Sequence, residues 1–141
     1  MGNIRLLMVD DEKAFLDSMI KRLEIRELDI SAVYNGEDAL KEIEKNKAIE
    51  VVLLDVKMPG IDGIETLVEI KRMAPLVEVI MLTGEATVKT AIDGMKLGAF
   101  DYLLKPCDID VLVGKIKGAA TRKREYEEKI RISLGETSSN T

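Results

Sequence analysis

The sequence predicts an α/β fold built on a parallel sheet. Short runs rich in valine, isoleucine and leucine alternate with longer segments of helical periodicity, and five such pairs follow one another. Strands separated by helices pair in parallel, and the helices then cover both faces of the sheet. Three of the runs are almost wholly apolar, as strands buried on both faces require. With 141 residues, 46% of them hydrophobic, the chain has room for one domain with one continuous core.

The apolar runs are bounded by turn-forming residues. Asn35-Gly36 ends the second run and Pro59-Gly60 follows the third, and such dipeptides mark turns. We therefore expect strands at residues 4–9, 29–34, 51–54, 77–82 and 100–104.

The segments between the strands carry apolar residues at helical spacing. Phe15, Met19 and Leu23 show this spacing in the first segment, and such stripes normally pack on a sheet. Gly98 follows the fourth segment in the position of a glycine end cap. We expect helices at residues 12–26, 36–45, 63–73, 86–97 and 108–129.

The last segment changes character after about residue 118. Residues 122–131 are highly charged, and residues 135–141 are polar. We place the folded domain at residues 1–120 and predict that residues 121–141 form a frayed helical extension with a disordered tail. The charged run is expected to be a solvated helix face, with a coiled-coil start or a linker as the alternative.

Composition and charge exclude several functions. The net charge of −5 argues against direct contact with nucleic acid, whose phosphates bind clustered lysine and arginine. The chain has no histidine and one cysteine, Cys107, which excludes histidine-based catalysis and an internal disulfide. Neither a signal peptide nor a membrane-spanning run is present, so we expect a soluble cytoplasmic protein without membrane contact.

Acidic residues directly follow two of the expected strands. Asp10 and Asp11 come after the first strand, and Asp55 comes after the third. In an open parallel sheet, ligands bind outside the carboxyl ends of the strands. Three carboxylates brought together there raise one another's pKa values unless a cation neutralises them. Oxygen ligands suit a hard ion, so we expect Mg²⁺, with Mn²⁺ as an alternative.

Phosphoryl transfer is the chemistry that this edge of the sheet predicts. A carboxylate can attack phosphorus to give an aspartyl phosphate, and Asp55 is the candidate nucleophile. Thr83 and Lys105 end the fourth and fifth strands, where they can contact the phosphoryl oxygens. Pro106 restricts the backbone of Lys105 and makes the bond between them a candidate for the cis form.

Four segments resemble the receiver domain of two-component response regulators, similar to the chemotaxis and nitrogen-regulation receivers. They are LLMVDDE at residues 6–12, LLDVKMPGIDG at 53–63, VIMLTG at 79–84 and GAFDYLLKP at 98–106. With the matching helices they cover about residues 4–120. The resemblance is specific because all four occur in order at the expected spacing, and it implies a single-domain (βα)5 flavodoxin-like fold with helices on both faces of a five-stranded sheet.

The resemblance also implies roles for individual residues. Asp55 would be the phosphorylated residue. Asp11 and Asp55 would bind the metal directly together with the backbone carbonyl of Lys57, and Asp10 would bind it through water.

Thr83 and Lys105 would contact the phosphoryl group. Thr83 and Tyr102 would also form a switch, since Tyr102 matches an aromatic residue of the family that turns inward as Thr83 moves. Cys107 departs from the family pattern, since many members carry phenylalanine there.

The implied function is a phosphorylation-activated signalling switch. A sensor histidine kinase or a phosphotransfer protein would donate the phosphoryl group. The surface of the fourth helix, fifth strand and fifth helix would then regulate an output protein or a missing output domain, and phosphorylation could also drive homodimerisation. The domain would catalyse only its own phosphorylation and dephosphorylation.

Other functions use the same residues. An interaction module would keep the fold without being phosphorylated. A metal-dependent phosphohydrolase would also form an aspartyl phosphate, but the haloacid dehalogenase type has a second aspartate where Lys57 stands. Flavin binding lacks its phosphate loop after the first strand. At single positions, Asp10 and Asp11 could cap the first helix, and Tyr102 could be a core residue.

Overall fold

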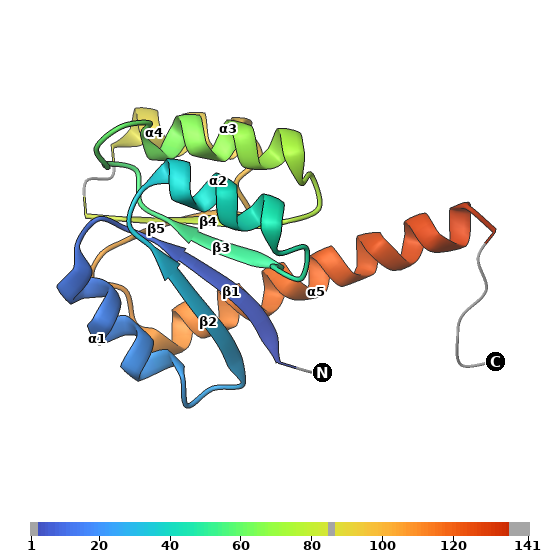
Figure 1. The fold of residues 1–141 in the computed structure, drawn as a ribbon, viewed down its shortest axis with the longest axis horizontal. Coiled ribbons are helices and arrows are strands. Elements are labelled where there is room, and N and C mark those ends of the chain that lie inside the picture. The colour runs from blue at the N-terminus through green and yellow to red at the C-terminus, as the bar shows by residue number, and fades with distance from the viewer. Residues whose placement is uncertain (1–2, 85–86, 136–141) are drawn as a thin grey trace.

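The computed structural model describes residues 3–84 and 87–135. Five strands alternate with five helices, and the strands form one parallel sheet in the order β2-β1-β3-β4-β5 (Figure 1). This topology confirms the predicted flavodoxin-like fold. The strands are β1 (Ile4–Val9), β2 (Leu28–Val33), β3 (Val51–Leu54), β4 (Glu78–Thr83) and β5 (Asp101–Leu104). The helices are α1 (Lys13–Leu23), α2 (Gly36–Lys45), α3 (Gly63–Met73), α4 (Val88–Lys96) and α5 (Ile109–Ser133).

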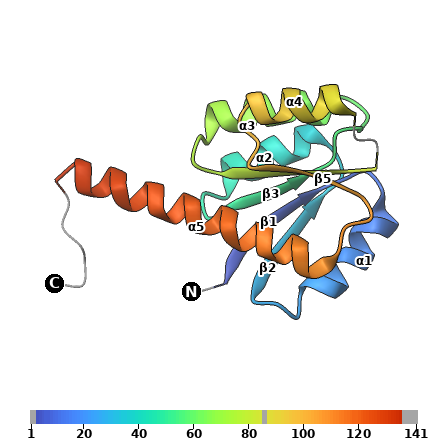
Figure 2. The same ribbon diagram turned by 180° about the vertical axis from the view of Figure 1, so that it is seen from behind.

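The helices form two layers around the sheet. Helices α2, α3 and α4 lie on one face, and α1 and α5 lie on the other (Figures 1 and 2). Alternate residues of β1 serve the two faces. Leu6 and Met8 pack into the core beneath α1 and α5, whereas Leu7 and Val9 pack into the core beneath α2 and α3.

The strand order places a switch in winding direction between β1 and β3. From β1 the chain crosses to β2 on one side, and it then returns to β3 on the other side. The register pairs Val9 with Leu54 and Leu54 with Met81, so the carboxyl ends of β1 and β3 are level and β4 extends two residues beyond them. Ligand sites of open α/β sheets form at such a switch.

Several element boundaries match the sequence prediction because the signals are local. Strands β1 and β3 and helices α2 and α3 have the predicted bounds. Asn35 caps α2 by accepting a hydrogen bond from the Asp38 amide at 2.7 Å. Asp62 and Glu65 form a capping box at the start of α3.

The predicted end of the first helix was wrong by three residues. Helix α1 stops at Leu23, and Glu27 adopts a positive φ of 34°. This turn brings Leu28 into register with Ile4, so β2 begins one residue earlier than predicted. Strands β4 and β5 each begin one residue later than predicted. The predicted start of the fourth helix at residue 86 lies outside the described residues.

Gly63 allows α3 to begin close to the end of β3. A Cβ at this position would lie 2.1 Å from the backbone oxygen of Asp55 and 2.6 Å from the Cα of Val56. Both neighbours are backbone atoms, which cannot rotate away. Any side chain at residue 63 would therefore displace the loop that carries Asp55.

Helix α5 is longer than predicted, and its charged run is partly anchored. Arg122 forms a two-bonded ion pair with Glu78, and Arg124 forms one with Glu50 at 2.6 and 2.7 Å. Lys123 is buried. The prediction of a solvated face was therefore wrong at residues 122–124, but most of residues 125–131 are exposed as predicted.

The far end of α5 stands apart from the sheet. The helix continues past the edge of the domain as a single rod (Figures 1 and 2). Of the predicted polar tail at residues 135–141, residues 136–141 lie outside the described residues. Among the helices of the described part, none combines the length and apolarity needed to cross a bilayer.

Candidate functional site

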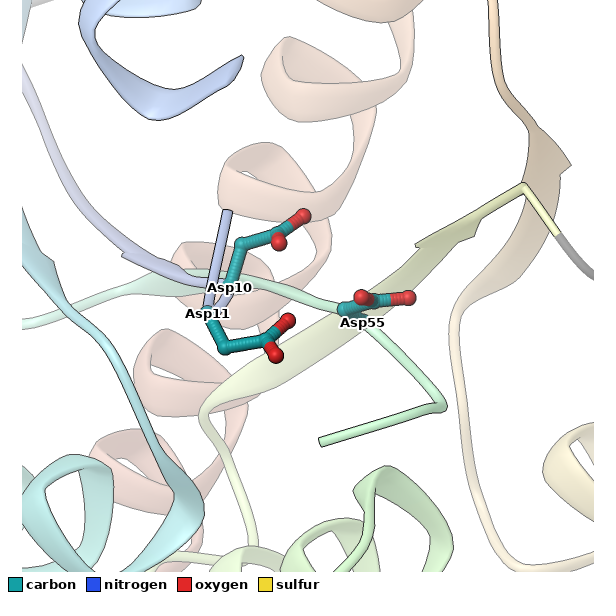
Figure 3. Close-up of side chains that lie close together, drawn as sticks. All are labelled: Asp10, Asp11 and Asp55. Carbon is teal, nitrogen blue, oxygen red and sulfur yellow. The ribbon is translucent and has the colours of Figure 1, made fainter. Parts of the chain in front are cut away.

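The three predicted acids meet at the carboxyl edge of the sheet. Asp10 and Asp11 follow β1 and Asp55 follows β3, and the three side chains lie close together in Figure 3. One oxygen of each carboxylate lies within 4.8 Å of the others. Asp10 and Asp55 are buried, whereas Asp11 is exposed. Within the described residues, these acids form the group close enough to share one metal ion.

Backbone hydrogen bonds fix the two buried acids. The Asp55 amide donates to the Val9 carbonyl at 3.0 Å, and Asp55 Oδ1 accepts from the Val56 amide at 2.8 Å. Asp10 Oδ1 accepts from the amide of Glu12, at the start of α1, at 2.9 Å. This bond belongs to the turn ahead of α1, whose N-cap residue Glu12 makes no side-chain capping bond, and it leaves the other oxygen of Asp10 to face the site.

Lys105 brings one positive charge to the acids. Its ammonium nitrogen lies 2.6 Å from Asp10 Oδ2, 3.2 Å from Glu12 Oε1 and 3.9 Å from Asp55 Oδ2. Burial lowers the pKa of Lys105, but the hydrogen bond and charge of Asp10 outweigh this effect and raise it. The lysine is therefore charged at neutral pH. Its peptide bond to Pro106 is cis, in line with the sequence.

The pKa of Asp55 is raised above its usual range. Burial is the main cause, and the charge of Asp10 adds to it. The charge of Lys105 and a hydrogen bond with the Thr83 side chain oppose the rise without cancelling it. The acids thus carry more negative charge than Lys105 neutralises, and a divalent cation with oxygen ligands fits this donor set.

The site opens to solvent as a shallow pocket of about 370 Å³. It brings together most of the predicted site residues and reaches Gly84, where a Cβ would have no neighbour within 4 Å. A small phosphodonor therefore has room to approach Asp55. The pocket is lined by Asp11, Glu12, Asp55, Lys57, Thr83, Gly84 and Lys105.

Tyr102 lies outside this pocket. Its half-buried ring packs against the core beneath α3 and α4, next to Gly94. Its hydroxyl and that of Thr90 in α4 lie 2.8 Å apart in a hydrogen bond. Tyr102 thus contacts α4 directly and is separated from the acids by β4.

Two contacts of Lys105 were not predicted from the sequence. Glu12 pairs with its ammonium, and the ring of Phe15 lies beneath it with the centroid 4.0 Å from the nitrogen. For Phe15 we predicted only a core role, because its helical spacing was the sole signal. Glu12 could have been found from its position, because it is a third acid directly after Asp10 and Asp11.

The chain belongs to the response regulator receiver domain family. The sequence model of that family matches residues 6–117. Receiver domains of this family are generally signalling switches in two-component systems.

Similar proteins include curated regulators and solved receivers. The transcriptional regulatory protein ZraR of Salmonella typhimurium is 36% identical over 124 residues, which cover 88% of this chain and 28% of ZraR. A CheY-like receiver domain protein from Methanospirillum hungatei has a TM-score of 0.83 and 30% identity, covering 89% of this chain and 99% of that one.

A third similar structure contains ligands. It is a response regulator protein from Burkholderia pseudomallei, solved with a phosphorylated aspartic acid, a calcium ion and citrate. Its TM-score is 0.76 at 25% identity, and the match covers 89% of this chain and 73% of that one. The chain described here thus spans a small part of ZraR and most of the two solved chains.

Proposed function

We propose that this receiver is switched on when Asp55 accepts a phosphoryl group from a histidine kinase or a phosphotransfer protein. The observation that carries the proposal is the meeting of Asp10, Asp11 and Asp55 with Lys105 and Thr83 at one open pocket. These residues come from the ends of four strands, and a purely structural role would not require them to converge.

Asp55 acts as the nucleophile in this proposal. Its carboxylate oxygen forms a bond to phosphorus, while the bond from phosphorus to the donor breaks and the donor keeps that electron pair. Val56 already holds Oδ1 through its amide, so Oδ2, on the side of Lys105, is the oxygen that attacks. Lys105 and Thr83 then contact the transferred phosphoryl oxygens, where negative charge accumulates.

Asp10, Asp11, Asp55 and the backbone carbonyl of Lys57 would hold Mg²⁺ or Mn²⁺. The ion would neutralise charge on the phosphoryl oxygens during transfer. The oxygen-only donor set and its excess negative charge support this assignment. The calcium ion in the phosphorylated Burkholderia regulator gives it further support.

Thr83 and Tyr102 would transmit the change. Thr83 would leave Asp55 for the phosphoryl group, and Tyr102 would turn inward and exchange its bond with Thr90. The hydrogen bonds of both side chains support this coupling. Exposed apolar residues on α4, β5 and α5 would receive the output partner or a second copy of the domain. They are Val88, Ile92, Met95, Leu104 and Val111.

The proposal also covers what this receiver regulates. ZraR is named as a transcriptional regulatory protein, and the matched part is 28% of its length. We therefore infer that this receiver controls an output domain or a separate protein without contacting nucleic acid itself. It would act in the cytoplasm, as response regulators generally do, and would turn over no other substrate.

Intact mass spectrometry tests the proposal. The protein is incubated with acetyl phosphate and Mg²⁺, and the wild type is expected to gain one phosphoryl group. Asp55→Asn and a metal-free sample should gain none. Asp62→Asn is the matched control, because Asp62 is a carboxylate that caps α3, and it should be labelled like the wild type. An unlabelled wild type would favour an interaction module instead.

A further inference from the structure

The ring of Phe15 has no role in the function proposed so far. Phe15 lies in the first turn of α1 and is half-buried. The Lys105 ammonium sits over the face of its ring, 4.0 Å from the centroid. The side chain of Lys105 is only 12% exposed, so little water competes for this contact.

Phe15 also forms a wall of the site beneath the acids. It lines a cavity of about 10 Å³ together with Asp10, Asp55 and Leu82. Such a volume has room for one water molecule at most. The ring thus helps to keep bulk water away from the lower side of the acceptor Asp55.

An aromatic face suits this place better than another acid. The face attracts a cation through its quadrupole, and the attraction is stronger where water is excluded. It carries no charge, binds no divalent ion and prefers no single direction for the ammonium. Lys105 now contacts Asp10 at 2.6 Å and has Asp55 at 3.9 Å, so it must turn to reach a phosphoryl group on Asp55. The ring can support the ammonium in both positions.

We infer that Phe15 is a positioning residue for phosphoryl transfer, whose ring face holds the Lys105 ammonium within reach of the phosphoryl group on Asp55. This inference rests on the proposed function of Asp55 and Lys105. It adds that the aromatic character of residue 15, beyond its bulk, sets the rate of the reaction.

Two substitutions at residue 15 separate aromatic character from packing. Phe15→Leu keeps an apolar side chain and removes the ring, whereas Phe15→Tyr keeps the ring. With acetyl phosphate at saturating Mg²⁺, the rate constant of phosphorylation should fall about tenfold in Phe15→Leu. It should stay within about threefold of the wild type in Phe15→Tyr. The affinity for Mg²⁺ should be the same in all three proteins.

Phe100 supplies the matched control. It is the other phenylalanine of the chain, and the guanidinium of Arg122 lies 4.8 Å from its ring centroid. Phe100→Leu removes a similar ring and a similar cation contact away from the acids. It should leave the phosphorylation rate unchanged.

A second measurement does not depend on phosphorylation. The ε-methylene protons of Lys105 lie near the face of the Phe15 ring, so their NMR resonances should be shifted upfield in the wild type. The shift should persist in Phe15→Tyr and disappear in Phe15→Leu.

The outcomes distinguish the inference from the function on which it rests. A wild-type rate in Phe15→Leu, or equal slowing in Phe15→Leu and Phe15→Tyr, would overturn the role of Phe15 while Asp55 stays the acceptor. An unshifted Lys105 resonance in the wild type would overturn it as well. A wild type that takes up no phosphoryl group would overturn the proposed function and the inference together.

Discussion

Buried acids lie at the amino end and at the carboxyl end of the sheet, and the two groups have opposite balances of charge. At the amino end, Glu50 precedes β3 and Glu78 begins β4, and each is paired with its own arginine from α5. At the carboxyl end, Asp55 shares the single ammonium of Lys105 with Asp10 and Glu12.

The pKa values follow from this difference in partners. Burial raises the pKa of Glu50, but the hydrogen bond from Arg124 and other positive contacts outweigh it and lower the pKa overall. Burial also raises the pKa of Asp55, and the charge of Asp10 raises it further. Burial alone therefore does not mark a functional acid. A buried acid left short of positive charge does, because it can bind a cation or react.

The largest effect is expected from removing the Lys105 ammonium at the carboxyl end. Lys105→Met should slow phosphorylation by acetyl phosphate at least about 100-fold, since one donor to a charged transition state contributes that much. Its affinity for Mg²⁺ should rise, because the ammonium no longer competes for Asp10. Lys115→Met is the control, as Lys115 pairs with Asp101 on the surface. A faster or unchanged reaction in Lys105→Met would contradict the role given to Lys105.

Neutralising an acid at the amino end should destabilise the fold. The side chain of Glu78 is 2% exposed and is bonded to Arg122, with Lys71 3.6 Å away. Glu78→Gln leaves these cations without their counter-charge and should lower the free energy of unfolding by about 2 kcal/mol. Urea denaturation measures the change. Glu69→Gln, on the surface of α3, should change it far less. An unchanged midpoint for Glu78→Gln would show that the pairing contributes no stability.

Neutralising an acid at the carboxyl end should stabilise the metal-free fold instead of destabilising it. In metal-free buffer, Asp55→Asn removes a repelling charge and should raise the free energy of unfolding by about 0.5–1 kcal/mol. Adding Mg²⁺ should then stabilise the wild type more than Asp55→Asn, because binding to the folded state raises stability by mass action. Destabilisation by Asp55→Asn without metal would break the contrast between the two ends.

The smallest effect is expected in the pH dependence of stability. The lowered pKa of Glu50 means that its stabilising charge is complete above the unfolded pKa of about 4.3 and is lost as pH falls through the folded value. The raised pKa of Asp55 has the opposite effect on stability. Its ionisation destabilises the metal-free fold as pH rises from about 3.9 through the folded value.

Urea titrations across this range, in the absence of metal, separate the two contributions. The stability lost in Glu50→Gln should shrink by a few tenths of a kcal/mol or more below about pH 4, because the wild-type carboxyl becomes protonated as well. The stability gained in Asp55→Asn should shrink at higher pH, as pH falls from the raised folded pKa toward about 3.9, for the same reason. Differences that stay constant down to pH 2 would contradict both assignments.

Sequence information was sufficient wherever the signal was local or came from the ends of strands. Asp10, Asp11 and Asp55 follow apolar runs, and parallel pairing alone brings such residues together. It was insufficient for partners that are distant in sequence. Glu78 and Arg122 are 44 residues apart, and Glu50 and Arg124 are 74 apart.

The arginine pairs were also hidden by composition. Arg122 and Arg124 stand in a charged run that is typical of an exposed helix, and nothing in the run distinguishes them from their neighbours. The first helix ended early for a similar reason. Ile25 fits the helical pattern but is 79% exposed, because Glu27 turns the chain toward β2.

Because the arginine pairs attach α5 to the sheet, a small tilt of the helix at these pairs becomes a larger displacement at its far end. Beyond Arg124 the helix runs nine more residues to Ser133, about 14 Å at the rise of an α-helix. The helix is attached at the amino ends of β3 and β4, and the other ends of these two strands carry Asp55 and Thr83. A tilt of roughly 5° at the arginine pairs would swing Ser133 sideways by about 1 Å. The position of a partner bound to the far end of α5 would therefore depend on the orientation of β3 and β4.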